Sequence, residues 1–259
     1  MDFKSIIPDK SISLFVKNIL VFEEQDAKQK TILPFFADGY PGLIFQETVN
    51  GLLINPHNKL MPAMFLYGQT LAPIELVMSG AYKLIIFQLY PFVLKSFFYV
   101  SPKDLNDNCY NLDQLNNNIG IDTIKKLSRA RNFTERTEII TIFLHSIFQE
   151  KQQELDFTIS KAIQKIINKK GQLIIGDLYD ELHLTERTFE RRFLNTVGVT
   201  AKQFSKIIQF QQSLEQLTLK DFTKLSDIVY ANGFADQSHF IKVFKAFTGK
   251  TPLAFKSQK

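Results

Sequence analysis

The clearest pattern of apolar and polar positions lies near the carboxy terminus, in GFADQSHFIKVFKAFTG from Gly233 to Gly249. Its apolar residues recur at helical spacing, so at about 100° per residue they form one stripe while the polar residues face the other way. Asp236 can accept hydrogen bonds from the free amides of a first helical turn, and Gly249 can adopt the positive φ that ends a helix. The stretch predicts an amphipathic helix over about 237–248. Taken alone, such a helix is typical of any protein surface.

The same pattern occurs a second time, 51 residues upstream. A repeat at a fixed offset indicates a duplicated structural unit. Each copy also follows a shorter helical pattern, IIGDLYDELHL or KLSDIVYANGF, which predicts two helix-turn-helix units whose turns differ in length. The matched positions are Thr185 with Asp236, Phe189 with Phe240, Phe193 with Phe244, Gly198 with Gly249, Thr200 with Thr251, and Phe204 with Phe255.

A long helix is predicted between the two copies, from Thr200 to about Leu217. This segment contains no glycine or proline, and Phe204, Ile207, Ile208, Gln211 and Leu214 fall near one face. At 1.5 Å per residue it would be roughly 25 Å long, the order of the distance of about 34 Å between successive major grooves of DNA. A helical bundle with an internal duplication is the alternative interpretation.

The residues from Phe157 to Lys259 resemble the DNA-binding domain of the AraC/XylS family of bacterial transcriptional regulators. The resemblance is carried by LTERTFERRFLNTVGVTAKQF in the first unit and GFADQSHFIKVFKAFTGKTPLAF in the second. In that family both units bind adjacent major grooves on one face of the duplex. The resemblance therefore implies sequence-specific binding to double-stranded DNA.

The resemblance also implies which residues face the DNA. Arginine can pair with guanine, glutamine with adenine and glutamate with cytosine, and an aliphatic side chain can touch the thymine methyl group. Contacts to the phosphate backbone instead fix the register. Any one of these residues alone is more often an ordinary surface residue. Base-facing and phosphate-facing positions match Arg187, Glu190 and Arg191 in the first unit and Gln237, Ser238, Ile241 and Lys242 in the second, and the candidates for backbone positioning are Thr188, His239, Lys202, Lys206 and Lys245.

The distribution of charge agrees with a polyanionic partner for the second half. Residues 157–259 hold 16 Lys or Arg against 9 Asp or Glu, a net charge of +7, whereas residues 1–156 hold 15 against 17, a net charge of −2. A basic domain joined to a slightly acidic one favours nucleic acid as the partner of the first and another task for the second.

No catalytic or metal-binding motif is recognisable. The four histidines are scattered, no phosphate-binding loop or nucleophile elbow occurs, and Cys109 stands alone. We therefore expect neither an enzyme, nor a metal, nor a cofactor. The start MDFKSIIPDK has no signal-peptide pattern, and Gln88, Pro91 and Lys95 interrupt the most apolar stretch, so the expected location is the bacterial cytoplasm, at the nucleoid, with no membrane contact.

The first half shows a different pattern. From about Thr31 to Val100, short apolar runs alternate with Gly, Pro and Asn turns, which is typical of strands in a sandwich or small barrel. Asp38-Gly39 is a turn signal that predicts a hairpin. This half resembles the β-rich domain found ahead of such DNA-binding modules, which implies binding of a small effector, homodimerisation, or both.

Two helices are predicted after Leu112, over Ile121 to about Arg129 and Thr134 to about Glu150, with Thr134 and Thr137 as candidate caps. The second carries a stripe that we expect to form a dimer surface, unless the helix simply covers the strand domain. A polar linker is expected over 149–157, although the helix could continue through it. The stripe contains Ile139, Ile140, Phe143, Leu144, Ile147 and Phe148.

These patterns predict an α+β protein with two domains. Residues 1–150 form a β-rich effector-binding or dimerisation domain with trailing helices, and residues 157–259 an all-α domain with two helix-turn-helix units joined by a long helix. The predicted function is a DNA-binding transcriptional regulator that inserts helices 186–196 and 237–248 into adjacent major grooves. The alternative is an adaptor protein that no longer binds DNA and needs no exposed Arg187, Arg191 or Lys242. The operator, the effector, the regulated genes, the oligomeric state and the choice between activation and repression stay open.

Overall fold

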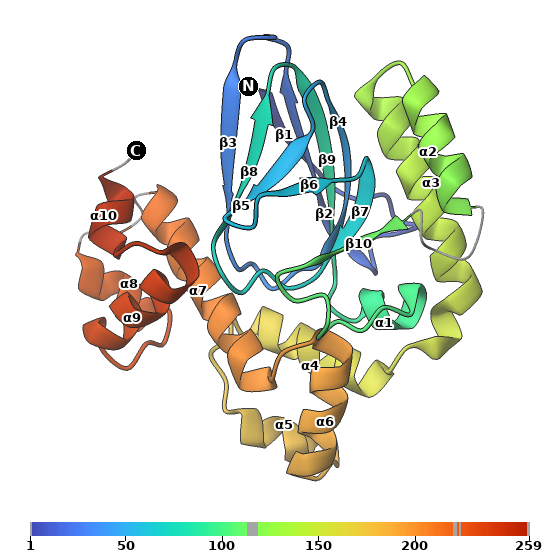
Figure 1. The fold of residues 1–259 in the computed structure, drawn as a ribbon. Coiled ribbons are helices and arrows are strands. Elements are labelled where there is room, and N and C mark those ends of the chain that lie inside the picture. The colour runs from blue at the N-terminus through green and yellow to red at the C-terminus, as the bar shows by residue number, and fades with distance from the viewer. Residues whose placement is uncertain (1, 113–118, 220–221, 223, 258–259) are drawn as a thin grey trace.

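The computed structural model describes residues 2–112, 119–219, 222 and 224–257 (Figure 1). A β-rich half is followed by helices, and the carboxy-terminal part is entirely helical. This arrangement confirms the predicted α+β class.

The strand half consists of two antiparallel sheets that pack face to face, which corresponds to the sandwich of the two predicted alternatives, a sandwich or a small barrel. The larger sheet has the strand order β1-β2-β9-β4-β7-β10 and the smaller one β3-β8-β5-β6. Ile44, Met78 and Leu84 belong to the apolar layer between the sheets. The strands are β1 (Asp2–Ile6), β2 (Val16–Glu24), β3 (Lys30–Phe35), β4 (Gly42–Thr48), β5 (Leu52–Asn55), β6 (Lys59–Met61), β7 (Met64–Tyr67), β8 (Ile74–Ser79), β9 (Tyr82–Leu89) and β10 (Cys109–Asn111).

The central strands β4 and β9 of the larger sheet are buried on both faces, whereas the edge strand β1 is exposed. Side chains alternate along a strand, so Ile44 and Ile86 face the smaller sheet while Leu43 and Phe87 belong to a second core shared with helices. Strands β1 and β2 precede Thr31, where strands were first predicted, so the sequence prediction missed them.

Three helices follow the sandwich: α1 (Val93–Phe98), α2 (Ile119–Arg129) and α3 (Phe133–Lys151). The Oδ1 atom of Asn132 accepts a hydrogen bond from the Glu135 N–H at 2.9 Å, at the position where a helix cap is expected. The predicted caps Thr134 and Thr137 are therefore wrong, because both residues lie inside α3.

The apolar stripe of α3 is buried within this chain. Its residues Ile140, Phe143, Leu144 and Phe148 are at most 4% exposed. The Phe148 ring lies 4.5 Å from the ring of Phe15, between centroids. The prediction of a dimer surface is wrong for these four side chains, since they cover the strand domain instead.

The loop of residues 36–41 is not the predicted hairpin. Strand β3 before it pairs with β8 in the smaller sheet, whereas β4 after it pairs with β7 and β9 in the larger one. The loop therefore crosses from one sheet to the other. Gly39 in this loop has a φ of 83°, in the region that favours glycine.

The helical half contains both predicted helix-turn-helix units. The first is formed by α5 and α6 and the second by α8 and α9, and α7 joins them (Figure 1). The expected linker is partly helical, because α3 continues to Lys151 and a short 3₁₀ turn, Gln152–Glu154, follows. The helices are α4 (Phe157–Asn168), α5 (Ile175–Glu181), α6 (Glu186–Val197), α7 (Ala201–Leu219), α8 (Leu225–Ala231), α9 (Gln237–Thr248) and α10 (Pro252–Lys256).

The loop of residues 36–41 also packs on α7 and so connects the strand domain to the helical half. The Ala37 carbonyl accepts a hydrogen bond from Nε2 of Gln211. A side-chain carbon at Gly39 would lie 2.9 Å from Cδ1 of Ile208, so only glycine permits this approach without displacement. The rings of Phe36 and Phe255 meet at 5.7 Å.

Asp38 lies in the same loop and is enclosed by it. Its Oδ1 accepts a hydrogen bond from the Tyr40 N–H at 2.9 Å, and its Oδ2 accepts one from Nε2 of Gln88 at 2.7 Å. Burial raises the pKa of this carboxyl to about 7, and the two hydrogen bonds oppose the shift. Part of the residue's surface stays accessible, so the energetic effect is smaller than a fully enclosed carboxyl would show.

We expect the wild type to lose stability as the pH rises toward about 7, because Asp38 then loses its proton inside the folded protein. The variant Asp38→Asn should not show this loss. An acid whose pKa is raised by folding keeps its proton after the unfolded chain has released it, so the free energy of unfolding falls through this window and levels off above it. Relative to the wild type, the variant should gain about 1–2 kcal/mol between about pH 5 and pH 8. Urea unfolding at several pH values measures this difference.

The matched control is Asp104→Asn, which changes an exposed carboxyl of the same half. It should leave the pH dependence of the wild type unchanged. Parallel stability curves for Asp38→Asn and the wild type would contradict the assignment.

Candidate nucleic-acid interface

The two units are built from the same local contacts. The Thr185 side chain accepts a hydrogen bond from the Thr188 N–H at the start of α6, and the Asp236 side chain accepts one from the His239 N–H at the start of α9. Both helices end at a glycine with positive φ, 87° at Gly198 and 74° at Gly249. The repeated sequence pattern thus produces the same helix boundaries twice.

The turns ahead of α6 and α9 have matching backbones but different lengths. His183 and Gly233 both have positive φ, 53° and 71°. The next residue in each turn donates its N–H to the preceding helix, Leu184 to the Tyr179 carbonyl and Phe234 to the Val229 carbonyl. The first turn covers 182–185 and the second 232–236, so the second is longer. This confirms the unequal turns inferred from the sequence.

In the first unit, α6 buries Phe189 and Phe193 and exposes Arg187 and Arg191. Glu190 is half-buried, and its Oε1 accepts a hydrogen bond from the Tyr179 hydroxyl at 3.1 Å. Burial, together with the neighbouring Glu190 carboxylate, raises the pKa of Tyr179 to about 12.

In the second unit, α9 buries its phenylalanines and presents a mostly polar face. Half-buried His239 packs against the ring of Phe234, with ring centroids 5.8 Å apart. Ile241 is also half-buried. The exposed residues of this face are Gln237, Ser238, Lys242 and Lys245.

The remaining candidates for backbone positioning differ in exposure. Thr188 is half-buried, and its Oγ1 accepts a hydrogen bond from the Thr185 hydroxyl at 2.9 Å. On α7, Lys202 is exposed and Lys206 is half-buried. The exposure of these candidates for backbone positioning is therefore less uniform than the sequence alone suggested.

An ion pair that the sequence analysis missed attaches α6 to α4. Nε of Arg192 lies 2.9 Å from Oδ2 of Asp156, and Nη2 lies 2.5 Å from Oδ1. Asp156 also caps α4 by accepting from the Ile159 N–H at 3.1 Å. Burial acts to raise the pKa of Asp156, but Arg192 and the amide hydrogen bonds outweigh it and lower the pKa. Helical spacing could have identified this arginine, because Arg192 lies one turn after buried Phe189 whereas Arg191 does not.

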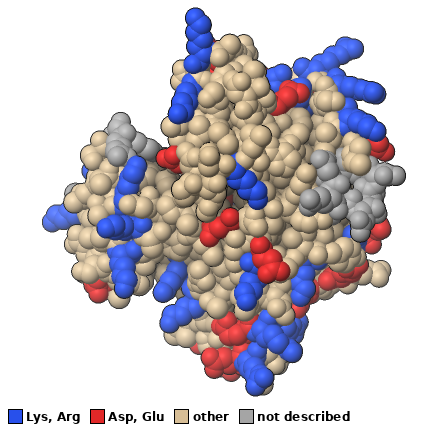
Figure 2. All heavy atoms as spheres, viewed as in Figure 1, with Lys and Arg blue, Asp and Glu red and all other residues tan. Residues whose placement is uncertain are grey.

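Figure 2 shows Lys and Arg side chains over both helix-turn-helix regions, with Asp and Glu interspersed over the α5–α6 region, and further Lys and Arg side chains over the strand domain and near α2. Within the described ranges, no group of three or more His, Cys, Asp or Glu side chains could hold a metal ion. No helix among the residues that the structure describes is long and apolar enough to cross a membrane.

Two helix-turn-helix units on one chain, each with exposed Lys or Arg side chains on its second helix, define a double helix-turn-helix module. Residues 178–258 match a family model described as a helix-turn-helix domain. Over 82 residues, 32% of this chain, the sequence is 32% identical to the HTH-type transcriptional activator RhaS of Yersinia pestis (strain Pestoides F) and of Yersinia pseudotuberculosis serotype O:1b (strain IP 31758). The carboxy-terminal domain is therefore similar to the helix-turn-helix domains of these transcriptional activators, in agreement with the resemblance found in the sequence.

The matched region covers only 30% of the length of these curated relatives. Residues 4–111 match a domain of unknown function (DUF6597), which assigns no activity to the strand domain. Solved structures with a partial likeness include ToxT from Vibrio cholerae, 15% identical over 99% of this chain and 98% of that chain at a TM-score of 0.49. The AraC-like transcriptional activator CuxR is 11% identical over 79% of this chain and 74% of that chain at a TM-score of 0.23.

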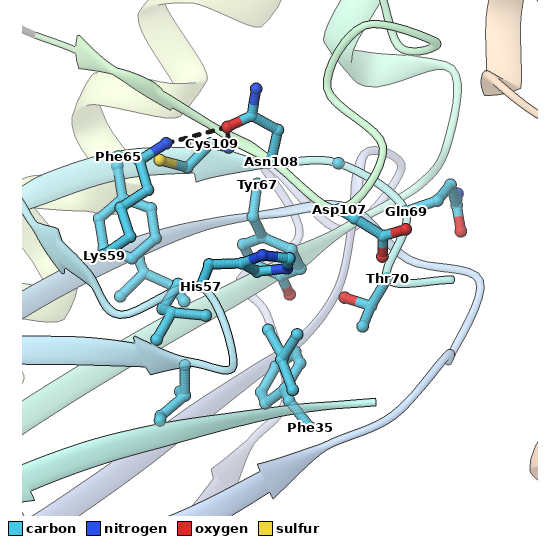
Figure 3. Close-up of a pocket in the computed structure, with 15 residues that line it drawn as sticks. Phe35, His57, Lys59, Phe65, Tyr67, Gln69, Thr70, Asp107, Asn108 and Cys109 are labelled. Carbon is cyan, nitrogen blue, oxygen red and sulfur yellow. Dashed lines mark hydrogen bonds between the residues drawn. The ribbon is translucent and has the colours of Figure 1, made fainter. Parts of the chain in front are cut away.

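A second candidate site is a pocket between the two sheets of the strand domain (Figure 3). Its volume is about 190 Å³, and its walls are mainly apolar, with Phe35, Ile44 and Phe65 among them. Exposed Lys59 lies at the pocket, where its Nζ donates to Oδ1 of Asn108 at 2.9 Å. The pocket therefore combines an apolar interior with a cation whose hydrogen-bond partner is a neutral side chain.

Further polar side chains at this pocket are Gln69 and Tyr67, which are buried, and Asp107, which is exposed. Gln69 is buried, and its Nε2 donates to the Gly39 carbonyl at 3.1 Å. Burial raises the pKa of Tyr67 well above its ordinary value, and the Tyr67 hydroxyl has no hydrogen-bond partner among the described atoms. Oδ1 of Asp107 accepts from the N–H groups of Leu71 and Ala72, at 2.6 and 3.1 Å.

We expect Asp236→Ala to destabilise the second unit, because the Asp236 Oδ1 accepts the His239 N–H at 2.7 Å. Loss of such a cap lowers the free energy of unfolding by about 1 kcal/mol. Asp236→Asn keeps an accepting oxygen and should remain close to the wild type. Denaturant unfolding of both variants measures the difference, and equal losses for Ala and Asn would contradict a capping role.

Proposed function

We propose that this protein is a sequence-specific regulator of transcription that inserts α6 and α9 into adjacent major grooves of double-stranded DNA. The observation that carries the proposal is the matched exposure of the two helices. Arg187 and Arg191 on α6, and Gln237 and Lys242 on α9, stay exposed while the phenylalanines on the opposite faces are buried. Such a regulator would act in the bacterial cytoplasm, and the proposal assigns it no catalytic reaction.

The exposed groups suit base recognition. An arginine fork matches the acceptors of guanine, a glutamine amide matches adenine, and Ile241 can contact a thymine methyl group. Glu190 accepts from the Tyr179 hydroxyl through Oε1, and a carboxylate can accept further hydrogen bonds, so Oε2 could accept from cytosine. Helix α7, with 19 residues, is roughly 28 Å long, which suits units that bind about one helical repeat apart.

The adaptor alternative explains these surfaces less well. An adaptor would keep the buried phenylalanines but would not require exposed cations at matching positions of both units. Arg187, Arg191 and Lys242 are all exposed. We therefore favour DNA as the partner.

We expect the double variant Arg187→Glu with Lys242→Glu to bind duplex DNA more weakly and with less dependence on salt. Each phosphate that a protein neutralises releases condensed counterions, so the logarithm of the binding constant falls linearly with the logarithm of salt concentration. Loss of one contact lowers the magnitude of that slope by about 1. Fluorescence anisotropy with duplexes selected from a random pool by the wild type measures both quantities.

The control reverses two exposed lysines of the strand domain, Lys10→Glu with Lys28→Glu, and so makes the same change in net charge. It should retain most of the wild-type slope. If both double variants lost affinity and slope equally, the effect would come from net charge and not from the assigned faces. An unchanged Arg187→Glu, Lys242→Glu variant would contradict the proposed interface.

We further propose that residues 1–150 form a ligand-sensing domain, with residues 157–259 as the DNA-binding domain, and that the pocket between the sheets holds the effector. Apolar walls with few polar groups are typical of small-molecule sites. Lys59 supplies a positive charge at the pocket. The Asp107 carboxylate, which also lines the pocket, already accepts hydrogen bonds from the backbone amides of Leu71 and Ala72. The matching ligand is a small apolar molecule with an anionic end. Homodimerisation through this domain is compatible with the proposal, although the buried stripe of α3 is not the surface.

We expect decanoate to bind the full-length protein and Lys59→Met to weaken that binding about tenfold, because the variant keeps the apolar stem and removes the charge. Decanol, which lacks the anionic end, should bind the two proteins equally. Isothermal titration calorimetry measures all four combinations. Equal affinity of decanoate for both proteins would refute the role of Lys59, and no binding of either compound would refute this ligand class.

A further inference from the structure

The segment between α4 and α5 runs directly over α7. Gly171 is buried and has a φ of 73°. A side-chain carbon at this position would lie 2.3 Å from the Ser205 carbonyl oxygen and 2.9 Å from Cγ of Gln209, both on α7. The backbone therefore passes α7 at a distance that only a glycine allows.

The next residue, Gln172, contacts the second helix-turn-helix unit. Its Nε2 donates a hydrogen bond to the carbonyl of Ala231, the last residue of α8, at 2.8 Å. Carbonyls in the last turn of a helix have no partner within the helix, so this bond satisfies one of them. The Gln172 side chain also lies against Gly233, where an added carbon would meet Cγ of Gln172 at 3.1 Å. A residue from the leading segment of the first unit thus contacts the turn of the second.

The two units otherwise have separate cores. Phe189 and Phe193 of α6 belong to a core shared with the strand domain, whereas Phe240 and Phe244 of α9 belong to another. Helix α7 contributes to both cores. Besides α7, the strand domain bridges the two units, because Ala37 belongs to the core of α9 and Phe36 packs on Phe255. Gln172 adds a direct contact between the units, away from the axis of α7.

We propose that Gln172 is a positioning residue that sets the angle between the two recognition helices. This inference rests on the proposed binding of both helices to one duplex. When two modules are linked, the second binds with an effective concentration that depends on whether their geometry matches both sites. Gln172 holds that geometry before DNA arrives, and it acts through α8 without touching a base or a phosphate.

The first test measures the geometry without DNA. Spin labels are placed at the exposed positions Asp177 of α5 and Tyr230 of α8 by substitution to cysteine in a Cys109→Ser background, and pulsed electron resonance gives their distance distribution in the full-length chain. We expect Gln172→Ala to broaden the distribution. Gln172→Lys, which keeps a donor on a long stem, should restore it, and Gln25→Ala in the strand domain should leave it unchanged. Identical distributions for Gln172→Ala and the wild type would overturn the proposal.

The second test measures binding to duplexes that carry one or both half-sites, selected with the wild type. Gln172→Ala should bind the full site about fivefold more weakly, the effect of losing one exposed hydrogen bond. Its affinity for each half-site and its salt slope should not change, which separates positioning from a phosphate contact. Insertion of one base pair between the half-sites should weaken the variant less than the wild type. An equal loss on half-sites would overturn the proposal.

The two tests separate this inference from the proposed function. If the wild type bound no duplex while the distance distribution still broadened in Gln172→Ala, the regulatory proposal would fail and the positioning of the two units by Gln172 would stand. If DNA bound as proposed while neither distances nor full-site affinity changed, only the role of Gln172 would fail.

Discussion

The packing of phenyl rings on α7 determines the arrangement of the whole helical half. Phe204, in the first part of α7, packs on Phe193 with ring centroids 5.9 Å apart, and Phe210, further along, packs on Phe244 at 5.5 Å. One helix therefore anchors both units, and the number of residues between the two anchoring rings sets the separation of the units along α7. Because the strand domain rests on the same helix through Gly39 and Gln211, its position is coupled to that of both units.

Much of the helical half could be predicted because its determinants are local. A cap, a phenylalanine every fourth residue and a terminal glycine act within a few residues of one another, so the repeat defined both recognition helices and their buried faces. The sandwich was also recognisable from its short strands and turns. The class of the module followed from two copies of one pattern, not from any single residue.

The features that could not be predicted depend on contacts between distant segments. Asp38-Gly39 has the composition of a hairpin turn, but the partners of β3 and β4 lie in different sheets, and pairing partners are not visible in a local pattern. The α3 stripe is equally apolar whether it meets another subunit or its own sandwich. Gln172 is an unremarkable polar residue in the sequence, and its contact with Ala231 depends on how the chain passes α7.

The absence of a side chain at Gly39 also affects how closely the strand domain and the helical half depend on each other. The core of the second unit includes Ala37 of the strand domain, and the loop backbone comes closest to α7 two residues later, at Gly39. A side chain at position 39 would press on Ile208, Phe204 and Ile207 of α7, which belong to the two cores that meet along this helix. One added methyl group at this position would therefore disturb the packing of both helix-turn-helix units at once.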